Sequence, residues 1–425
     1  MTDIDQPGHD QARDRSLRVL LSAYALSQLG NWLFRTGVVF FAYNQNNGST
    51  AVLTTAIVLV YLPILFGSRL LAPLADRLDT RRTLIGLDAL RAVLLTVLLV
   101  VVWIGVGSTS AATIGVMALL SVLTPFFTAS QTAYLRRVLP SERIPGALAS
   151  VSRIDWSTFV LGTAAAPLLL QYTDLPMLII VDIVTFVVSG WLLVRLMLAP
   201  KPVDGPGGGQ AGSWKPRLTL SSKWLLVSVF ALNAGAGLIN VYPNVVARDF
   251  LGGGAGWLSA INLANGVGGV IGATLAGRLR ERGGLRAGVL AAVVVAVSLA
   301  GMTFVTTAWI AILASSLMLL AGQVFAVTFQ SRILADEPVA VAGRVSGLFT
   351  MCTFAGVTAS MLLFIGMTSS ESLRGSFTAL LVLASVVALV SAVVGFTALR
   401  RYGDRSAEPV LTAEPVPLDA RSERP

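Results

Sequence analysis

The stretch TLIGLDALRAVLLTVLLVVVWIGV, residues 83–106, shows most clearly the kind of segment that decides the fold of this chain. A helix needs about 20 apolar residues to cross the hydrocarbon core of a bilayer, which is about 30 Å thick. This run is long enough, and its charges near one end, Asp88 and Arg91, are spaced to pair on one helical face. We therefore predict a membrane-spanning helix here.

Similar apolar runs extend in both directions along the chain. Hydrophobic residues make up 55% of the sequence and charged residues only 12%, about half the roughly 25% of a soluble domain. We predict an all-α integral membrane protein with twelve transmembrane helices. The expected spans are 17–43, 51–75, 83–106, 110–132, 146–171, 174–198, 223–247, 255–279, 285–306, 308–332, 343–367 and 374–399.

The distribution of basic residues predicts the orientation of these spans. Lys and Arg collect in alternate connections, and the connections expected outside the cell hold only Arg248 and Arg374. Because cytoplasmic loops carry the excess of basic residues, both termini are expected in the cytoplasm. The expected location is the inner membrane of the cell. The predicted division is 1–16 N-terminal tail, 17–198 six-helix bundle, 199–222 linker, 223–399 six-helix bundle and 400–425 C-terminal tail.

Several functional classes do not fit this composition. The net charge of +9 is spread over short runs between apolar stretches, so no nucleic-acid partner is expected. His9 and Cys352 are the single residues of their kinds, and no phosphate-binding Gly-x-x-x-x-Gly-Lys-Ser/Thr loop is present. We therefore expect no enzyme activity, no metal, no cofactor and no ATP-driven transport, and we expect a monomer in the lipid bilayer.

Short internal matches indicate two related halves. LADRL (74–78) recurs as LAGRL (275–279), each time after the second predicted span of a half. The segment APLADRLDTRR (72–82) resembles the loop signature of the major facilitator superfamily, and other segments resemble its enterobactin and macrolide exporter branch. These are LDALRA (87–92), LPSERIP (139–145), VDIVTF (181–186) and ARDFLGGG (247–254). The resemblance implies two pseudo-symmetric six-helix bundles and an exporter.

The resemblance also implies a gate at the inner end of the second span. Ion pairs there would hold the two halves of the protein in one conformational state. The alternative is that the basic residues of this loop only set the orientation of the protein in the membrane. Asp88 and Arg91 are expected to stabilise this gate rather than to contact substrate. The gate candidates are Asp76, Arg77, Arg81, Arg82, Asp88 and Arg91.

Charged residues inside predicted spans are candidates for proton coupling, because a carboxylate in a membrane is costly unless it is paired, faces a cavity or takes up a proton. Asp155 and Asp182 are the candidate carriers, with Arg35 and Arg153 as expected partners. Asp155 is preferred because it lies deeper in its span. The alternative is that these four residues form fixed ion pairs.

Uncharged polar residues at helical spacing indicate a substrate cavity, although hydrogen bonds between helices explain them equally well. The candidates are Gln28, Asn31, Asn233, Asn240, Asn262, Asn265, Gln323 and Gln330. The expected function is export of a small amphiphilic molecule, such as a drug, secondary metabolite or siderophore, in exchange for protons. Uptake by symport or facilitated diffusion is the alternative, and a non-transporting receptor is a third possibility.

Overall fold

The computed structural model describes residues 7–105, 107–140, 143–197, 218–252, 254–304, 307–337, 342–368 and 373–402, and these ranges are almost entirely helical. The helices are α1 (Pro7–Gln45), α2 (Thr50–Arg77), α3 (Thr80–Ile104), α4 (Thr109–Val138), α5 (Ile144–Tyr172), α6 (Leu175–Leu193), α7 (Leu220–Ala236), α8 (Tyr242–Val245), α9 (Gly254–Gly301), α10 (Ala308–Asp336), α11 (Ala342–Thr368) and α12 (Leu373–Tyr402). Short turns of other helix types are η2 (Gly237–Asn240), η3 (Val246–Phe250) and η4 (Met302–Phe304).

Helix α3 shows why these elements belong in a membrane. Its aliphatic residues Val93 and Val97 are 57% and 55% exposed, whereas its charged residues Asp88 and Arg91 are buried. Water would favour the opposite arrangement, but lipid solvates the exposed apolar face. Across the residues that the structure describes, nine helical segments are long and apolar enough to cross a bilayer. The chain is therefore an integral membrane protein.

Local sequence signals set the ends of several helices. Ser49, Asp79 and Ser108 stand before α2, α3 and α4, and each side chain accepts a hydrogen bond from a backbone N–H of the first turn. Such caps satisfy amides that have no partner inside the helix. Gly105 ends α3 with φ +71°, a left-handed conformation that glycine adopts without steric cost.

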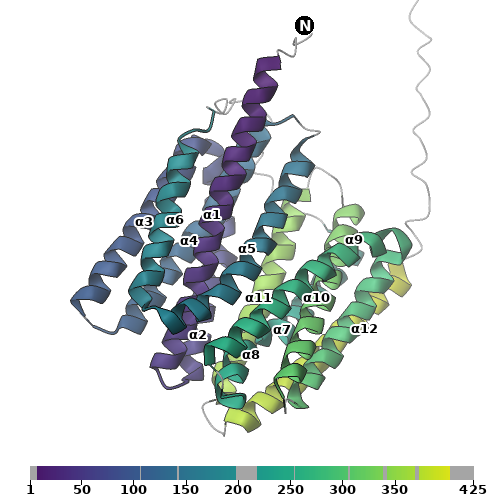
Figure 1. Ribbon diagram of the computed structural model, residues 1–425. Helices are drawn as coiled ribbons and strands as arrows, with labels where there is room; N and C mark the ends of the chain where they lie inside the picture. The colour runs from purple at the N-terminus through teal and green to yellow at the C-terminus, as the bar shows by residue number, and fades with distance from the viewer. Residues whose placement is uncertain are drawn as a thin grey trace, which may run out of the picture.

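The helices pack in two groups. In the first group, α1 packs against α4, α5 and α6, α2 against α4, and α3 against α4 and α6. In the second group, α7 packs against α11 and α12, and α9 packs against α10 and α12 (Figure 1). The groups meet where α5 contacts α9 and α2 contacts α11. Gly266 allows the first of these contacts, since a Cβ there would clash with a methyl group of Val160.

The seventh predicted span changes its winding in the middle. Residues Leu220–Phe250 form one candidate span, but they run through α7, the 3₁₀ turn η2, the short helix α8 and the π turn η3. Pro243 near the start of α8 cannot donate a backbone hydrogen bond, which favours such a break. Irregular backbone is tolerated at membrane depth where it lines a cavity or packs within protein.

Two boundaries differ from the sequence expectation. The predicted N-terminal tail is helical from Pro7, and an ion pair of 2.7 Å between Asp14 and Arg143 ties this extension of α1 to the residue before α5. The eighth and ninth predicted spans form one helical segment, α9. Its two apolar stretches, Gly254–Leu279 and Gly284–Phe304, are nevertheless separate candidate spans. The predicted linker and C-terminal tail lie almost wholly outside the described residues.

Candidate functional site

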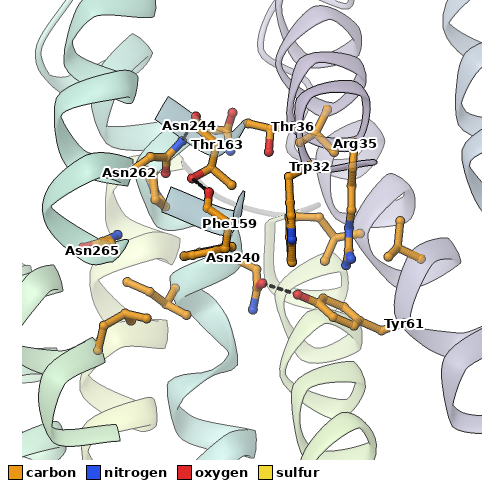
Figure 2. Close-up of a pocket in the computed structure, with 16 residues that line it drawn as sticks. Trp32, Arg35, Thr36, Tyr61, Phe159, Thr163, Asn240, Asn244, Asn262 and Asn265 are labelled. Atoms are coloured by element: carbon orange, nitrogen blue, oxygen red, sulfur yellow. Dashed lines mark hydrogen bonds between the residues drawn. The ribbon is translucent and has the colours of Figure 1, made fainter. Parts of the chain in front are cut away.

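A cavity of about 160 Å³ lies between the two groups of helices, and several polar side chains line it (Figure 2). Both groups contribute to it. Its lining is Trp32, Arg35, Thr36, Val39, Ile57, Val60, Tyr61, Phe159, Thr163, Ile239, Asn240, Pro243, Asn244, Asn262, Asn265 and Leu319. Small-molecule sites in helical proteins lie preferentially between helices of a bundle, so this cavity is the candidate binding site.

One face of α1 supplies the charge of the cavity. Trp32, Arg35, Thr36 and Val39 follow the spacing that places residues on one side of a helix. The Arg35 guanidinium carbon lies 5.1 Å from the ring centre of Trp32 and 4.9 Å from that of Tyr61. Within the described lining, Arg35 is the one charged side chain. The cavity is therefore electropositive on the side of the first group.

Four asparagines of the second group also line the cavity (Figure 2). Asn240 accepts a hydrogen bond of 2.6 Å from the Tyr61 hydroxyl, and the amide nitrogen of Asn262 donates to the Thr163 carbonyl at 3.1 Å. Both bonds join the two groups. The buried side-chain oxygens of Asn244 and Asn265 have no hydrogen-bond partner among the described residues. Unpaired buried amides are costly, and although these two oxygens have almost no accessible surface in this state, a ligand that reached them would satisfy them.

A second contact joins the groups at the end of the molecule that carries the α1–α2 connection, the lower end in Figure 1. We call it the Tyr43 latch, and it consists of Tyr43, Arg248 and Asp249. The Tyr43 hydroxyl donates a short hydrogen bond to Asp249, while Arg248 donates to the Tyr43 carbonyl at 2.9 Å. A Cβ on Gly48, whose φ is +75°, would lie 2.7 Å from the Arg248 guanidinium. These contacts hold the two groups together, and we call this the closed end of the molecule.

We predict that Tyr43→Phe opens the closed end. A hydrogen bond to a carboxylate is worth about 1.5–3 kcal/mol, so its loss should shift the conformational equilibrium by about 10- to 100-fold. The measurement is the reaction rate of a Thr36→Cys side chain, in a Cys352→Ser background, with a maleimide added from the side of the α1–α2 connection. Tyr172→Phe, at a tyrosine that is 81% exposed, is the control. Equal rates in both variants would reject the latch.

Buried charges lie inside the first group. Asp88 and Arg91 of α3 form an ion pair of 3.3 Å, and both are almost fully buried. Ser189 of α6 donates a hydrogen bond of 2.6 Å to the other oxygen of Asp88. Asp182 of α6 is also buried, where one of its oxygens accepts a hydrogen bond of 3.2 Å from the Thr185 hydroxyl and the other has no hydrogen-bond partner among the described residues. A second buried carboxylate is stable when it takes up a proton.

Asp155 of α5 has a different environment. It is half-buried, and its carboxylate accepts a hydrogen bond of 2.5 Å from the Tyr24 hydroxyl of α1. It lies one and two helical turns before Phe159 and Thr163, which line the cavity. Among the residues with described side chains, no ion pair involves Asp155. Asp155 therefore lies on the face of α5 that continues to the cavity, and it has no described ion-pair partner.

Comparison with known proteins identifies the family. The pattern of the Major Facilitator Superfamily matches residues 20–361, which is most of the chain. The chain belongs to this superfamily. The uncharacterized MFS-type transporter YkuC of Bacillus subtilis (strain 168) is 27% identical over 207 residues. The match covers 48% of this chain and 46% of YkuC, so the chain matches about half the length of this relative.

Solved structures of other transporters have the same fold. The POT family transporter PepTSo gives a TM-score of 0.72 at 12% identity, covering 92% of this chain and 99% of that one. A bacterial homologue of the iron transporter ferroportin, in an inward-facing state, gives 0.68 at 15% identity, with 90% and 98% covered. The nucleoside transporter NupG also gives 0.68, at 12% identity, with 90% and 99% covered. At these identities the likeness shows the fold alone. Membership in this superfamily of transporters points away from enzyme catalysis.

The residues that resemble the superfamily's gate signature remain within the first group in this structure. Arg81 donates a short hydrogen bond to the carbonyl of Val194, and Arg82 pairs with Asp79 at 3.5 Å on the surface. Asp88 and Arg91 connect α3 to α6. Asp76 and Arg77 end α2, but their side chains lie outside the described residues. The proposed role of these residues in holding the two halves together stays a prediction.

The described contacts of the two candidate proton carriers differ from the expected arginines. Arg153 is exposed and donates to Ser150 at 2.9 Å, and Arg35 stacks on aromatic rings in the cavity. Asp155 accepts instead from Tyr24 of α1, and Asp182 accepts from Thr185 of its own helix. The contact of Asp155 joins two helices, so spacing within one helix did not indicate it.

Of the eight polar residues expected in the cavity, Asn240, Asn262 and Asn265 line it. The other five lie outside its described lining: Gln28, Asn31, Asn233, Gln323 and Gln330. Asn233, for example, donates back to the Val229 carbonyl of its own helix at 2.8 Å. Sequence reasoning missed Thr36, Thr163 and Asn244. Asn244 follows Pro243 and lies four residues after Asn240, and together these features would have indicated it.

Proposed function

We propose that this chain is a secondary active transporter that exports a small amphiphilic molecule from the cytoplasm by alternating access, in exchange for protons. In this proposal the two groups of helices are six-helix bundles with twelve spans in total. They lie in an inner membrane with both termini in the cytoplasm, and the protein acts as a monomer. The cavity between the groups carries the proposal, since it combines aromatic rings, amides and one cation from helices on both sides.

The arrangement of contacts supports alternating access. The bonds described between the groups lie in the cavity or between it and the α1–α2 connection. With the N-terminus in the cytoplasm, the closed end faces outward and the cavity would fill from the cytoplasm. Breaking the Tyr43 latch and forming new contacts at the other end would then release substrate outside.

The volume of the cavity limits the substrate in this state. Pockets for drug-sized ligands usually measure about 300–1,000 Å³, and a cavity near 150 Å³ holds a molecule the size of benzene. At about 160 Å³ the observed cavity fits a compact substrate or one end of a larger one. Larger drugs or siderophores would need the two groups to separate further.

Uptake by symport or facilitated diffusion is the alternative within transport. The fold does not decide the direction, and a nucleoside transporter and a peptide transporter share it. The half-buried carboxylate of Asp155 beside the cavity favours a proton-coupled mechanism of either kind over simple diffusion.

The test is retention of a panel of dyes, antibiotics and compact aromatic acids in efflux-deficient cells that express the chain. We expect lower retention of at least one compound, reversed by a protonophore that collapses the proton gradient. The control is the same cells with an empty vector. Lower retention that the protonophore leaves unchanged would contradict proton drive, and higher retention would favour uptake.

A further inference from the structure

We propose that the cavity binds a substrate with a negatively charged group, held by Arg35, and a flat apolar part that lies against the neighbouring aromatic rings. This inference rests on the proposed transport function and adds a chemical class to its substrate. The expected ligand is a compact organic anion, such as an aromatic carboxylate.

The charge balance of the described cavity carries the first step. Arg35 is the one charged group in its described lining, and its guanidinium faces Trp32 and Tyr61 rather than a carboxylate. A cation inside a membrane protein is costly without a counter-charge. Aromatic faces offset part of this cost. A bound anion would supply the remainder, and a guanidinium can donate two parallel hydrogen bonds to a carboxylate.

The acids of the first group are engaged elsewhere. Asp88 is paired with Arg91 inside the group, and Asp182 accepts a hydrogen bond from Thr185 of its own helix. Asp155 accepts the hydrogen bond from Tyr24. Since these carboxylates have other partners, the cation of Arg35 remains available to a ligand.

Rings and amides around Arg35 define the rest of the ligand. Trp32 and Phe159 meet edge to face at 4.8 Å, which leaves an apolar wall beside the guanidinium (Figure 2). On the opposite side, Asn244 and Asn265 have side-chain oxygens without a partner in the described part of the chain. An amide also carries N–H donors, so these residues can bind either polar atoms or a second oxygen of an acid. The site thus fits an aromatic ring with an acidic group.

A negatively charged substrate has a consequence for the direction of transport. An inside-negative membrane potential favours exit of a monovalent anion by a concentration ratio on the order of 50-fold per 100 mV. Exchange of one such anion for one incoming proton would move two charges in the favourable direction. Anionic substrate therefore fits export better than uptake.

The test uses probes of equal shape and different charge: benzoate, benzamide and benzamidine, and the corresponding naphthalene compounds. Binding to the purified full-length protein is measured from the ligand-dependent rise in its unfolding temperature. We expect at least one anion to bind 10-fold or more tightly than its neutral partner, and the cation to bind most weakly. Arg35→Gln should remove the preference for the anion, and Arg35→Lys should retain part of it.

Arg195→Gln is the matched control. Arg195 is an exposed arginine that also stacks on a tryptophan, at 3.7 Å from the ring centre of Trp191, and it lies outside the cavity. The control should keep the full preference for the anion. The proposal is overturned if no anion binds better than its neutral partner, or if Arg35→Gln binds the anion as the wild type does. The unfolding temperature without ligand shows whether each variant is folded.

Failure of this inference can be separated from failure of the proposed function. If cells show energised export but the protein shows no preference for anions, the anionic substrate class is rejected and the proposed transport function is retained. Arg35-dependent binding of anions without protonophore-sensitive flux would keep the binding site and reject proton-coupled export.

Discussion

Replacing Asp155 with asparagine is expected to abolish proton-driven flux while substrate exchange across the membrane continues. Asparagine has the same shape and can still accept the hydrogen bond from the Tyr24 hydroxyl, which is 2.5 Å long in the native protein. It cannot take up or release a proton at neutral pH. The structural contacts should therefore survive, and only the coupling should be lost.

The measurement is uptake into proteoliposomes with and without an imposed pH gradient, for a compound found in the cell assay. The control is Asp174→Asn, which removes an exposed carboxylate before α6 whose side chain makes no capping hydrogen bond. It should keep full gradient-driven flux. Normal gradient-driven flux in Asp155→Asn would remove this residue from the coupling role and leave Asp182 as the remaining candidate.

Replacing Arg91 with methionine is expected to destabilise the protein by about 3–5 kcal/mol, because a buried carboxylate then loses its cation. Arg91 is 1% exposed and pairs with Asp88, while Phe127 and Phe186 lie 4.7 and 5.4 Å from its guanidinium carbon. The loss is read from the unfolding temperature in detergent and from the yield of monodisperse protein.

The chain contains a matched pair for comparison. Arg82 and Asp79 have the same spacing in sequence as Arg91 and Asp88, but the Arg82 side chain is 86% exposed. Exposed ion pairs are worth about 0–1 kcal/mol, so Arg82→Gln should change the unfolding temperature little. The double variant Asp88→Leu, Arg91→Met should recover part of the stability lost in Arg91→Met. Equal losses of stability in Arg82→Gln and Arg91→Met would show that burial of the Asp88–Arg91 pair does not increase its contribution to stability.

Hydropathy and charge spacing predicted much of the fold because both are local. The bilayer imposes a length on each span, and the apolar run at 83–106 appears as α3 with its exposed aliphatic face. The pairing of Asp88 with Arg91 also followed from their spacing on one helix. The change of helix type after Ala236 was not predicted. Mean hydropathy over a window gives no information about the backbone effects of single glycine or proline residues.

The candidate site was predicted less completely because it depends on which face each helix turns toward the other group. Asn240 and Asn233 share a spacing of seven residues, yet only Asn240 lines the cavity, since the 3₁₀ turn between them rotates its side chain. Arg35 was expected to pair with a carboxylate. Its position beside Tyr61 depends on packing between α1 and α2, which no pattern within α1 encodes.

Residues 237–250 combine three helix types, and this has a consequence for how substrate selectivity can change between homologous proteins. A 3₁₀ turn, an α turn and a π turn advance the chain by different angles per residue, so they fix the directions of Asn240 and Asn244. A single insertion, deletion or proline shift in this segment would redirect these amides while the faces of α7 that pack on α11 and α12 stay the same. Homologues could thus acquire a new specificity by rewinding one segment while every side chain in the rest of the cavity stays the same.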